Sequence, residues 1–313
     1  MNGSAALVHA LLCGALLSAG SGGAPTRAKA PELTAEPLSL DAFQAAPSGR
    51  ADQRVAYGSD PSQFADLRVP RTPGPHPVVV LIHGGCWRAS FANLRDLAPM
   101  AEALVTDGIA TWNVEYRRLP QPGSGWPGTF TDVGLAIDHL RTIAAEQKLD
   151  LDRVVAVGHS AGGQLALWAA ARHRLPSGSE LAVRDPLALA GVVDLDGPGD
   201  LEAFLRYEAD GCGAGIVGSL LGGSPTKFPE RYAQSSAGRM LPLGVPQILV
   251  WGALDGIVSP VLGEEYAKAA KAAGDSVRLE ILPGRGHFDA ASPTTPSWPV
   301  VHAAIRELLK LKP

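Results

Sequence analysis

The sequence predicts an α/β fold, with a mostly parallel central sheet flanked by helices. Runs of branched apolar residues, such as "HPVVVLIHGG", are typical of strands that are buried on both faces. Between these runs lie segments whose apolar residues recur at helical spacing, such as "TDVGLAIDHLRTIAAEQ". Because the two patterns alternate repeatedly, we expect parallel strands joined by right-handed crossovers.

The expected elements begin at residue 76 and continue to residue 311. Branched apolar runs predict strands at residues 76–85, 109–118, 153–159, 187–197, 246–255 and 277–284. Helical spacing predicts helices at residues 131–147, 160–173, 260–274 and 296–311. The interval at residues 197–244, between two strands, is too long for an ordinary connection in a compact domain. We expect this interval to form a small helical lid insert over the functional site.

The amino-terminal residues have a different composition from the domain. Residues 1–23 are interpreted as a signal peptide, because the apolar stretch at residues 5–17 has the length of such a segment and small residues follow it. Export to the periplasm or the exterior is therefore expected, with no stable membrane span after processing; the alternative is a cytoplasmic protein with a surface-bound amino-terminal segment. Residues 24–50 are rich in Pro, Ala and Ser and predict a linker or cap arm, and residues 51–313 predict the folded domain.

The composition excludes several classes of function. The 313 residues carry a net charge of −4 without a basic stripe, so nucleic acid is not an expected partner. Cys13, Cys86 and Cys212 lie far apart, unlike the ligands of a zinc or iron–sulfur site. Because no nucleotide-binding fingerprint is present either, we expect a small-molecule substrate and chemistry without a metal or cofactor. The oligomeric state is not predicted.

A candidate nucleophile stands in "VAVGHSAGGQLA", where Ser160 occupies the centre of a G-x-S-x-G motif. The motif follows a predicted strand and opens a predicted helix, which is the context of a strained turn that exposes the serine. Gly158 and Gly162 leave room where side chains would collide. The start of the helix also favours a developing negative charge. An ordinary glycine-rich helix start is the alternative interpretation.

A serine nucleophile needs a base and an orienting acid, which in this architecture follow it in the order acid, then His. His287 is the candidate base, because its glycine-rich loop lies between the last strand and the last helix, whereas His173 and His302 fall within helical patterns. Asp255 is the candidate acid, because it directly follows a strand. Asp194 and Asp196, at the end of the preceding strand, are rivals for the acid, whereas Asp289 is too close to His287 in sequence to be the expected partner.

Besides the nucleophile and its acid and base, the reaction needs hydrogen-bond donors for an oxyanion, and the segment "VVVLIHGGCWRAS" is the candidate source. At this segment the chain resembles the α/β-hydrolase family. The resemblance is to hormone-sensitive-lipase-like carboxylesterases, which have an H-G-G-G motif, and to arylformamidases, which have H-G-G-x-W. It runs from about residue 65 to residue 311 and includes Ser160, Asp255, His287 and "VEYRRLP". It implies an α/β-hydrolase fold and hydrolysis of a carboxylic ester through an acyl-enzyme, with N-formylkynurenine hydrolysis as the runner-up. A catalytically silent binding protein is the third alternative.

The resemblance also implies how the oxyanion of a tetrahedral intermediate is bound. The donors are the backbone amides of Gly85, Cys86 and Ala161. Gly84 permits the turn, and the side chain of His83 pins the loop by hydrogen bonds. Cys86 departs from the family pattern, which has Gly at this position in the lipase-like esterases, although the amide donor survives the change.

Three further features remain open at this point. Trp87 either forms a wall of the acyl pocket or packs beneath the loop, and Trp126 either lines the site or shields a polar pair. That pair is expected among residues 115–117 and Asp132, as a buried ion pair with no catalytic role. If export removes Cys13, only Cys86 and Cys212 are left, so a disulfide between the oxyanion loop and the lid is one interpretation and two free thiols are the other.

Overall fold

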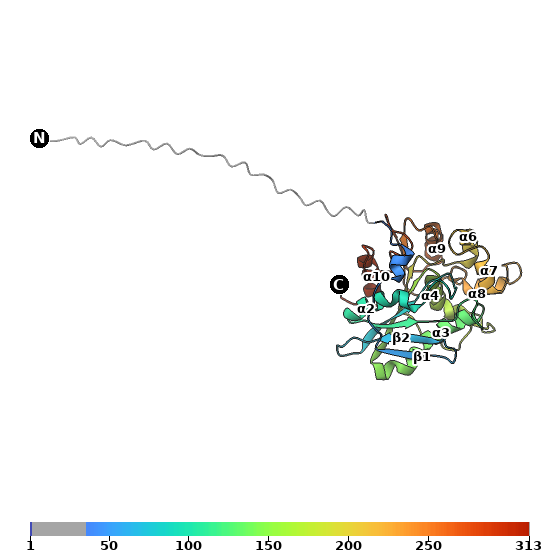
Figure 1. Cartoon of the computed structure of the whole chain (residues 1–313), viewed down its shortest axis with the longest axis horizontal. Helices are drawn as coiled ribbons and strands as arrows, with labels where there is room; N and C mark the ends of the chain where they lie inside the picture. Colours follow the sequence, from blue (N-terminus) through green and yellow to red (C-terminus); the bar gives the residue numbers. More distant parts are fainter. Residues whose placement is uncertain (2–35, 313) are drawn as a thin grey trace. The chain divides into compact units, whose positions relative to one another are not determined.

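The computed structural model describes Met1 and residues 36–312, and the fold lies in residues 36–312 (Figure 1). The signal peptide expected at residues 1–23 and the first part of the expected linker lie outside the described residues. No helix in residues 36–312 has the length and apolar content needed to cross a bilayer.

One eight-stranded sheet forms the centre of the fold, in the order β1-β2-β4-β3-β5-β6-β7-β8. The strands are β1 (Gln53–Ala56), β2 (Phe64–Arg68), β3 (His76–Ile82), β4 (Ala110–Val114), β5 (Leu149–His159), β6 (Gly191–Leu195), β7 (Gln247–Gly252) and β8 (Val277–Leu282). Strands β3 to β8 pair in parallel, whereas β1 and β2 add antiparallel at one edge. The predicted α/β-hydrolase architecture is confirmed. The two antiparallel edge strands were not among the expected elements.

Helices cover both faces of the sheet (Figure 1). The longer helices are α2 (Ala98–Thr106), α3 (Gly128–Gln147), α4 (Ala161–Ala171), α9 (Pro260–Ala272) and α10 (Trp298–Leu308). Alternate residues of β3 point to opposite faces, because side chains alternate along a strand. Val78, Val80 and Ile82 belong to the core with α3 and α4, and Val79 and Leu81 to the core with α2 and α10. The continuous apolar run thus follows from burial on both faces.

Short helices occupy the long interval after β6. They are α5 (Leu201–Phe204), α6 (Glu208–Gly211), α7 (Ile216–Leu221), α8 (Pro229–Ser235) and a 3-10 turn at Ala237–Arg239. This matches the small helical insert expected at residues 197–244. Gly211 at the end of α6 reaches the cavity beside Ser160, so the insert contributes to the wall of the site.

The described part of the amino-terminal arm belongs to the folded domain. Residues 36–50 include helix α1 (Leu40–Gln44), whose Phe43 is only 4% exposed and joins one of the two cores. Low periodicity in the arm concealed this buried aromatic anchor, which packs the arm onto the domain expected to begin at residue 51. Of the two interpretations for residues 24–50, the cap arm describes residues 36–50.

Candidate active site

Ser160 stands at a sharp turn between β5 and α4. Its φ of 57° lies in the left-handed region, which residues with a side chain rarely adopt. A Cβ on Gly158 would lie 2.0 Å from the carbonyl oxygen of Gly162, and a Cβ on Gly162 would lie 2.0 Å from that of Ile82. Both glycines of the motif are therefore required by close approach. The turn holds Ser160 at the carboxyl edge of the sheet, where the predicted motif needed it.

The loop at residues 83–88, called the oxyanion loop after the role that the resemblance implies, follows β3 and has an unusual backbone. Gly85, Cys86 and Trp87 have φ values of 99°, 50° and 53°, so three successive residues are left-handed. Gly84 is needed for a different reason, because a Cβ there would lie 2.9 Å from the Cβ of Ser160. The glycine that supplies the turn is thus Gly85, and Gly84 allows the loop to approach the serine.

Three backbone amides, two in the oxyanion loop and one at the start of α4, lack an acceptor within residues 36–312. Ala161 is the first residue of α4, and the first amides of a helix have no acceptor within it. Within residues 36–312, the amides of Gly85, Cys86 and Ala161 donate no hydrogen bond to another residue. Gly85 and Cys86 line the same cavity as Ser160. These amides are therefore available to an oxygen atom of a bound ligand.

A buried polar cluster supports the oxyanion loop from below. The side chain of His83 is fully buried, and its Nε2 lies 3.1 Å from Oε1 of Glu115. Nη2 of Arg118 lies 2.5 Å from the same oxygen, and the hydroxyl of Tyr116 donates to the carbonyl of His83 (2.7 Å). Burial alone would raise the pKa of Glu115, but His83 and Arg118 hold it below its usual value. His83 thus fixes the loop by hydrogen bonds, as the resemblance implies.

A disulfide joins Cys86 to Cys212, with their Cα atoms 5.5 Å apart. It connects the oxyanion loop to the end of α6 in the insert, across a sequence separation of 126 residues. The structure thus contains the bond that the sequence left open. In this state the sulfur of Cys86 is bonded to that of Cys212 and is no nucleophile.

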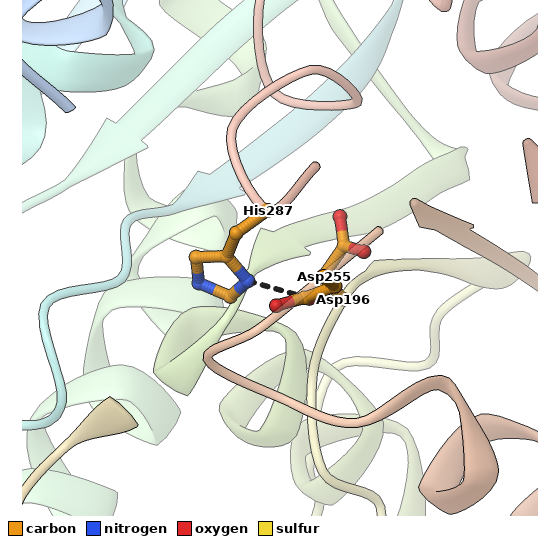
Figure 2. A group of neighbouring side chains, drawn as sticks. All are labelled: Asp196, Asp255 and His287. Carbon is orange, nitrogen blue, oxygen red and sulfur yellow. Dashed lines mark hydrogen bonds and ion pairs between the residues drawn. The ribbon is translucent and has the colours of Figure 1, made fainter. Parts of the chain in front are cut away.

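Asp255 and His287 form a hydrogen-bonded pair, shown in Figure 2. Nδ1 of His287 lies 2.7 Å from Oδ2 of Asp255, so the ring donates its Nδ1 proton to the carboxylate. The other oxygen, Oδ1, accepts the amides of Ile257 (2.7 Å) and Val258 (2.9 Å). Three hydrogen bonds therefore fix the carboxylate, and the carboxylate fixes the ring.

The two rival carboxylates stand beside this pair without bonding to the histidine. Asp194 and Asp196 lie at the end of β6, fully buried, and Oδ1 of Asp196 accepts the amide of Gly252 (2.8 Å). Burial raises the pKa of both carboxyls well above their usual value, and the charge of Asp255 raises that of Asp196 further. Asp255 is thus the carboxylate that orients His287.

Asp196, Asp255 and His287 each bring one possible metal-ligand atom within 4.8 Å of the others (Figure 2). Two features argue against a metal centre at this group. Nδ1 of His287 is already used by Asp255, and the raised pKa of Asp196 favours a protonated carboxyl, which is a poor ligand. The arrangement fits an acid–base pair with a neutral neighbour better than a cation site.

A cavity of about 220 Å³ opens beside Ser160 and His287. The other walls are mostly apolar and come from distant parts of the chain: Leu40, Phe43, Phe91, Leu97, Ile257 and Phe288. Ser160, His287 with its carboxylate partner Asp255, and the loop residues Gly85 and Cys86 are therefore gathered at one mostly apolar cavity.

A family model described as BD-FAE matches residues 66–269. The matched range includes the oxyanion loop, Ser160 and Asp255. The chain belongs to the BD-FAE family. The hydrolase resemblance stated from the motifs is thereby confirmed.

Two curated proteins match parts of this BD-FAE chain. A protein of Arabidopsis thaliana named "Probable isoprenylcysteine alpha-carbonyl methylesterase" is 29% identical over 113 residues, which are 36% of this chain and 23% of that protein. A non-reducing polyketide synthase of Aspergillus calidoustus is 33% identical over 152 residues, which are 43% of this chain and 6% of the synthase. The chain spans less than a quarter of the length of either relative.

Solved structures with the same fold match a larger share of the chain than the two curated proteins do. A truncated carbohydrate esterase from gut microbiota matches with a TM-score of 0.68 and 20% identity, covering 88% of this chain and all of that chain. Esterase 2 of Thermogutta terrifontis, phosphorylated by paraoxon, matches with a TM-score of 0.65 and 19% identity, covering 82% of this chain and 92% of that chain. An acetyl ester-xyloside bifunctional hydrolase of Caldicellulosiruptor lactoaceticus matches with a TM-score of 0.67 and 20% identity, covering 83% of this chain and 97% of that chain. At these identities the likeness shows the fold.

The two tryptophans considered for the substrate pocket do not line the cavity of Ser160. Trp87 is 1% exposed, and its Nε1 donates to Oε1 of Gln164 (3.2 Å), so it packs beneath the loop. Nε1 of Trp126 donates to Oε1 of Glu180 (3.0 Å), on the insert side of the molecule. Of the alternatives left open by the sequence, the contacts of Trp87 fit packing beneath the loop, and neither ring lines the cavity beside Ser160.

Other expectations from the sequence have clear outcomes. The buried ion pair is Arg117 with Asp132, at 2.6 Å, and Asp132 is fully buried. His302 of α10 contacts Asp107 at the end of α2, and His173 contacts the carbonyl of Ala170. Neither of these histidines reaches the cavity beside Ser160, as expected.

The contacts of two residues were not predicted from the sequence, where one of them, Asp289, was only a disfavoured candidate for the acid. His159, the residue directly before Ser160, is buried, and its Nε2 contacts the carbonyl of His287 (2.9 Å). Asp289 accepts the amides of Leu38 (3.0 Å) and Gly286 (2.9 Å) with one oxygen. The contacts of His159 with His287 and of Asp289 with Leu38 span 128 and 251 positions in the sequence, so no local pattern predicts them.

Proposed function

We propose that the protein is a serine hydrolase that cleaves carboxylic esters through an acyl-enzyme. The observation that carries the proposal is the pairing of His287 with Asp255 at the same cavity that Ser160 lines. Membership of the BD-FAE family and the fold shared with esterases support the same reaction class.

In the proposed reaction, Oγ of Ser160 attacks the ester carbonyl carbon while Nε2 of His287 takes the serine proton. The carbonyl oxygen becomes an oxyanion and accepts hydrogen bonds from the amides described above. Collapse breaks the bond to the alcohol oxygen, which leaves with the proton held by His287. Water then attacks the acyl-enzyme with the same histidine as base, and the carboxylic acid is released with Ser160 restored.

Asp255 keeps the ring of His287 in the tautomer that this sequence requires. With the Nδ1 proton held by the carboxylate, Nε2 is the nitrogen left to receive the serine proton. The fixed amides of the oxyanion loop add stabilisation that appears only when the oxyanion forms. Removing one such donor typically costs about 2.7–4 kcal/mol of transition-state stabilisation.

A fluorophosphonate probe tests the nucleophile directly. The wild-type protein should be labelled at one serine, and Ser160→Ala should abolish both labelling and hydrolysis of p-nitrophenyl acetate. Ser177→Ala changes an exposed serine far from the cavity and should leave both signals intact. Equal labelling of wild type and Ser160→Ala would refute the proposal. Failure of the folded wild type to react would favour a silent binding protein instead.

The choice between ester and formamide is tested by comparing p-nitrophenyl esters with N-formylkynurenine. We propose esters as the substrates, because Trp87 of the H-G-G-x-W pattern is buried away from the cavity. Turnover of the formamide with all esters inert would reverse this assignment.

We also propose that the protein is exported to the periplasm or the exterior. The buried disulfide between Cys86 and Cys212 supports export, because such bonds persist in oxidising compartments. Fractionation of the producing cells, followed by sequencing of the amino terminus, tests the proposal. An intact amino terminus in a cytosolic fraction, with both cysteines reduced, would contradict it.

A further inference from the structure

A short segment ahead of the sheet crosses the site although it lies more than a hundred residues from Ser160 in sequence. We call residues 37–44 the strap; they end in helix α1. The strap is fixed at its start by Asp289, whose buried Oδ2 accepts the amides of both Leu38 (3.0 Å) and Gly286 (2.9 Å). One carboxylate oxygen therefore ties the strap to the loop that carries His287.

The other end of the strap is anchored by aromatic packing and one hydrogen bond. The ring of Phe43 stacks on Phe288 at a centroid distance of 5.4 Å and meets His159 edge-on at 5.6 Å. Nε2 of Gln44 donates to the carbonyl of Phe91 (2.7 Å), a residue that also lines the cavity. The strap is thus held at the histidine loop and at the segment that follows the oxyanion loop.

Between these anchors the strap forms a wall of the cavity. Leu40, Phe43 and Gln44 line the same space as Ser160 and His287. Phe43 is buried, whereas Leu40 is 44% exposed and stands at the rim. The side chain at position 40 can therefore change in size without disturbing a core.

The size of the cavity limits what it accepts. Its volume is about 220 Å³. A cavity of about 150 Å³ holds benzene, and sites for drug-sized ligands begin at roughly 300 Å³. The space beside Ser160 fits one aromatic ring or a short branched chain, and a long acyl chain would have to leave past the strap.

We propose that the strap is the specificity-determining wall of the site, and that it restricts the ester to a compact apolar group beside the scissile bond. The proposal rests on ester hydrolysis by Ser160 and names the class of ester. Leu40 sets the length of the group that fits, while Phe43 closes the inner end.

Two substitutions at the rim test the proposal in opposite directions. Leu40→Ala should shift the preferred chain to longer groups, and Leu40→Trp should lower kcat/KM for the largest good substrate by about tenfold, since one methylene in an apolar pocket changes it by 10-fold or more. Acetate esters should change by less than about threefold, because they do not reach the wall. Two series separate the two groups of the ester: acyl chains of 2–12 carbons on p-nitrophenol, and alcohols of rising size on acetate.

Leu135 offers a matched control, because it is an equally exposed leucine (41%) on α3, away from the cavity. Leu135→Ala and Leu135→Trp should leave both series unchanged. A shifted profile in either series for the Leu40 variants supports the proposal. Unchanged profiles in both series, with fluorophosphonate labelling of Ser160 intact, would overturn it while leaving the proposed function standing. Loss of labelling in the wild type would instead overturn the proposed function.

Discussion

The oxyanion loop and the histidine loop, residues 283–289, are both glycine-rich and meet at one edge of the sheet, but they are held by different forces. A disulfide, a buried ionic cluster and three left-handed residues hold the oxyanion loop. The histidine loop is held by Asp255, by the strap through Asp289 and by aromatic packing on Phe288. One loop is fixed through its backbone, and the other through its side chains.

The difference follows from what each loop contributes. Backbone amides serve an oxyanion only when the chain itself is rigid, so covalent and buried ionic restraints suit the oxyanion loop. His287 needs one ring orientation and one tautomer, which a single carboxylate fixes. Disrupting the first loop should therefore reduce stability and activity together, whereas disrupting the second should reduce activity alone.

The largest expected effect is on activity, from Asp255→Asn. The asparagine can still accept the amides of Ile257 and Val258, but it no longer favours the Nδ1–H tautomer of His287. In a serine protease the corresponding change lowers kcat about 10⁴-fold, and we expect a loss of about 10³- to 10⁴-fold here. Ester hydrolysis and thermal unfolding should be measured together, with unfolding little changed.

Asp196→Asn is the matched control for that experiment. Its carboxyl is buried beside Asp255 and does not bond His287, so we expect less than about a tenfold change in kcat. A larger loss for Asp196→Asn than for Asp255→Asn would exchange the roles assigned to the two residues.

Glu115→Gln should reduce stability most. It removes the charge that pairs with His83 and Arg118 and leaves a buried guanidinium unbalanced. Breaking a buried ion pair on one side typically costs about 3–5 kcal/mol. Because the cluster supports the oxyanion loop, kcat should fall as well. Urea unfolding gives the first quantity and ester hydrolysis the second.

Glu307→Gln serves as the control for Glu115. It breaks a surface pair with Arg278, which should be worth less than about 1 kcal/mol. Equal losses for the two variants would mean that the cluster beneath the loop is not a special restraint.

The double variant Cys86→Ala with Cys212→Ala should lower the free energy of unfolding by about 2–4 kcal/mol, because the bond closes a long loop. Differential scanning calorimetry with and without a reducing agent measures the effect. The reductant should lower the unfolding temperature of the wild type and leave the double variant unchanged. A response of both proteins would assign the effect to something other than this bond.

The smallest effect concerns His159, which touches both loops. Burial lowers its pKa to about 3 from the ordinary 6.5, and His287 adds to the decrease. A depressed pKa contributes stability that is present above pH 6.5 and is lost as the pH falls toward 3. When the pH is lowered from 7 to 5, the free energy of unfolding of the wild type should therefore fall by about 2 kcal/mol relative to that of His159→Gln.

His173→Gln supplies the comparison for this pH experiment, because His173 is exposed at the end of α4. Its stability difference from the wild type should stay nearly constant between pH 7 and pH 5. A constant difference for His159→Gln as well would contradict the burial argument.

The features that could be predicted are those that depend on residues close together in the sequence. Apolar runs predicted β3 to β8, and the motif around Ser160 predicted the turn, because both depend on neighbouring residues. The strap and Asp289 depend on contacts across 251 positions in the sequence, for which a single sequence gives no signal. Trp87 was ambiguous because the direction of its ring depends on an unusual backbone angle that no residue type announces.

The disulfide also divides the reaction centre in a topological sense. Residues 86–212 form a covalent macrocycle that contains Ser160 and Ala161, whereas Asp255 and His287 belong to the linear chain beyond it. A protease cut anywhere inside the macrocycle would leave a single molecule that separates into two fragments only after reduction. A single cut inside the macrocycle therefore leaves Ser160 covalently connected to the rest of the protein. A single cut between residues 213 and 254 instead breaks the covalent connection of Ser160 to Asp255 and His287.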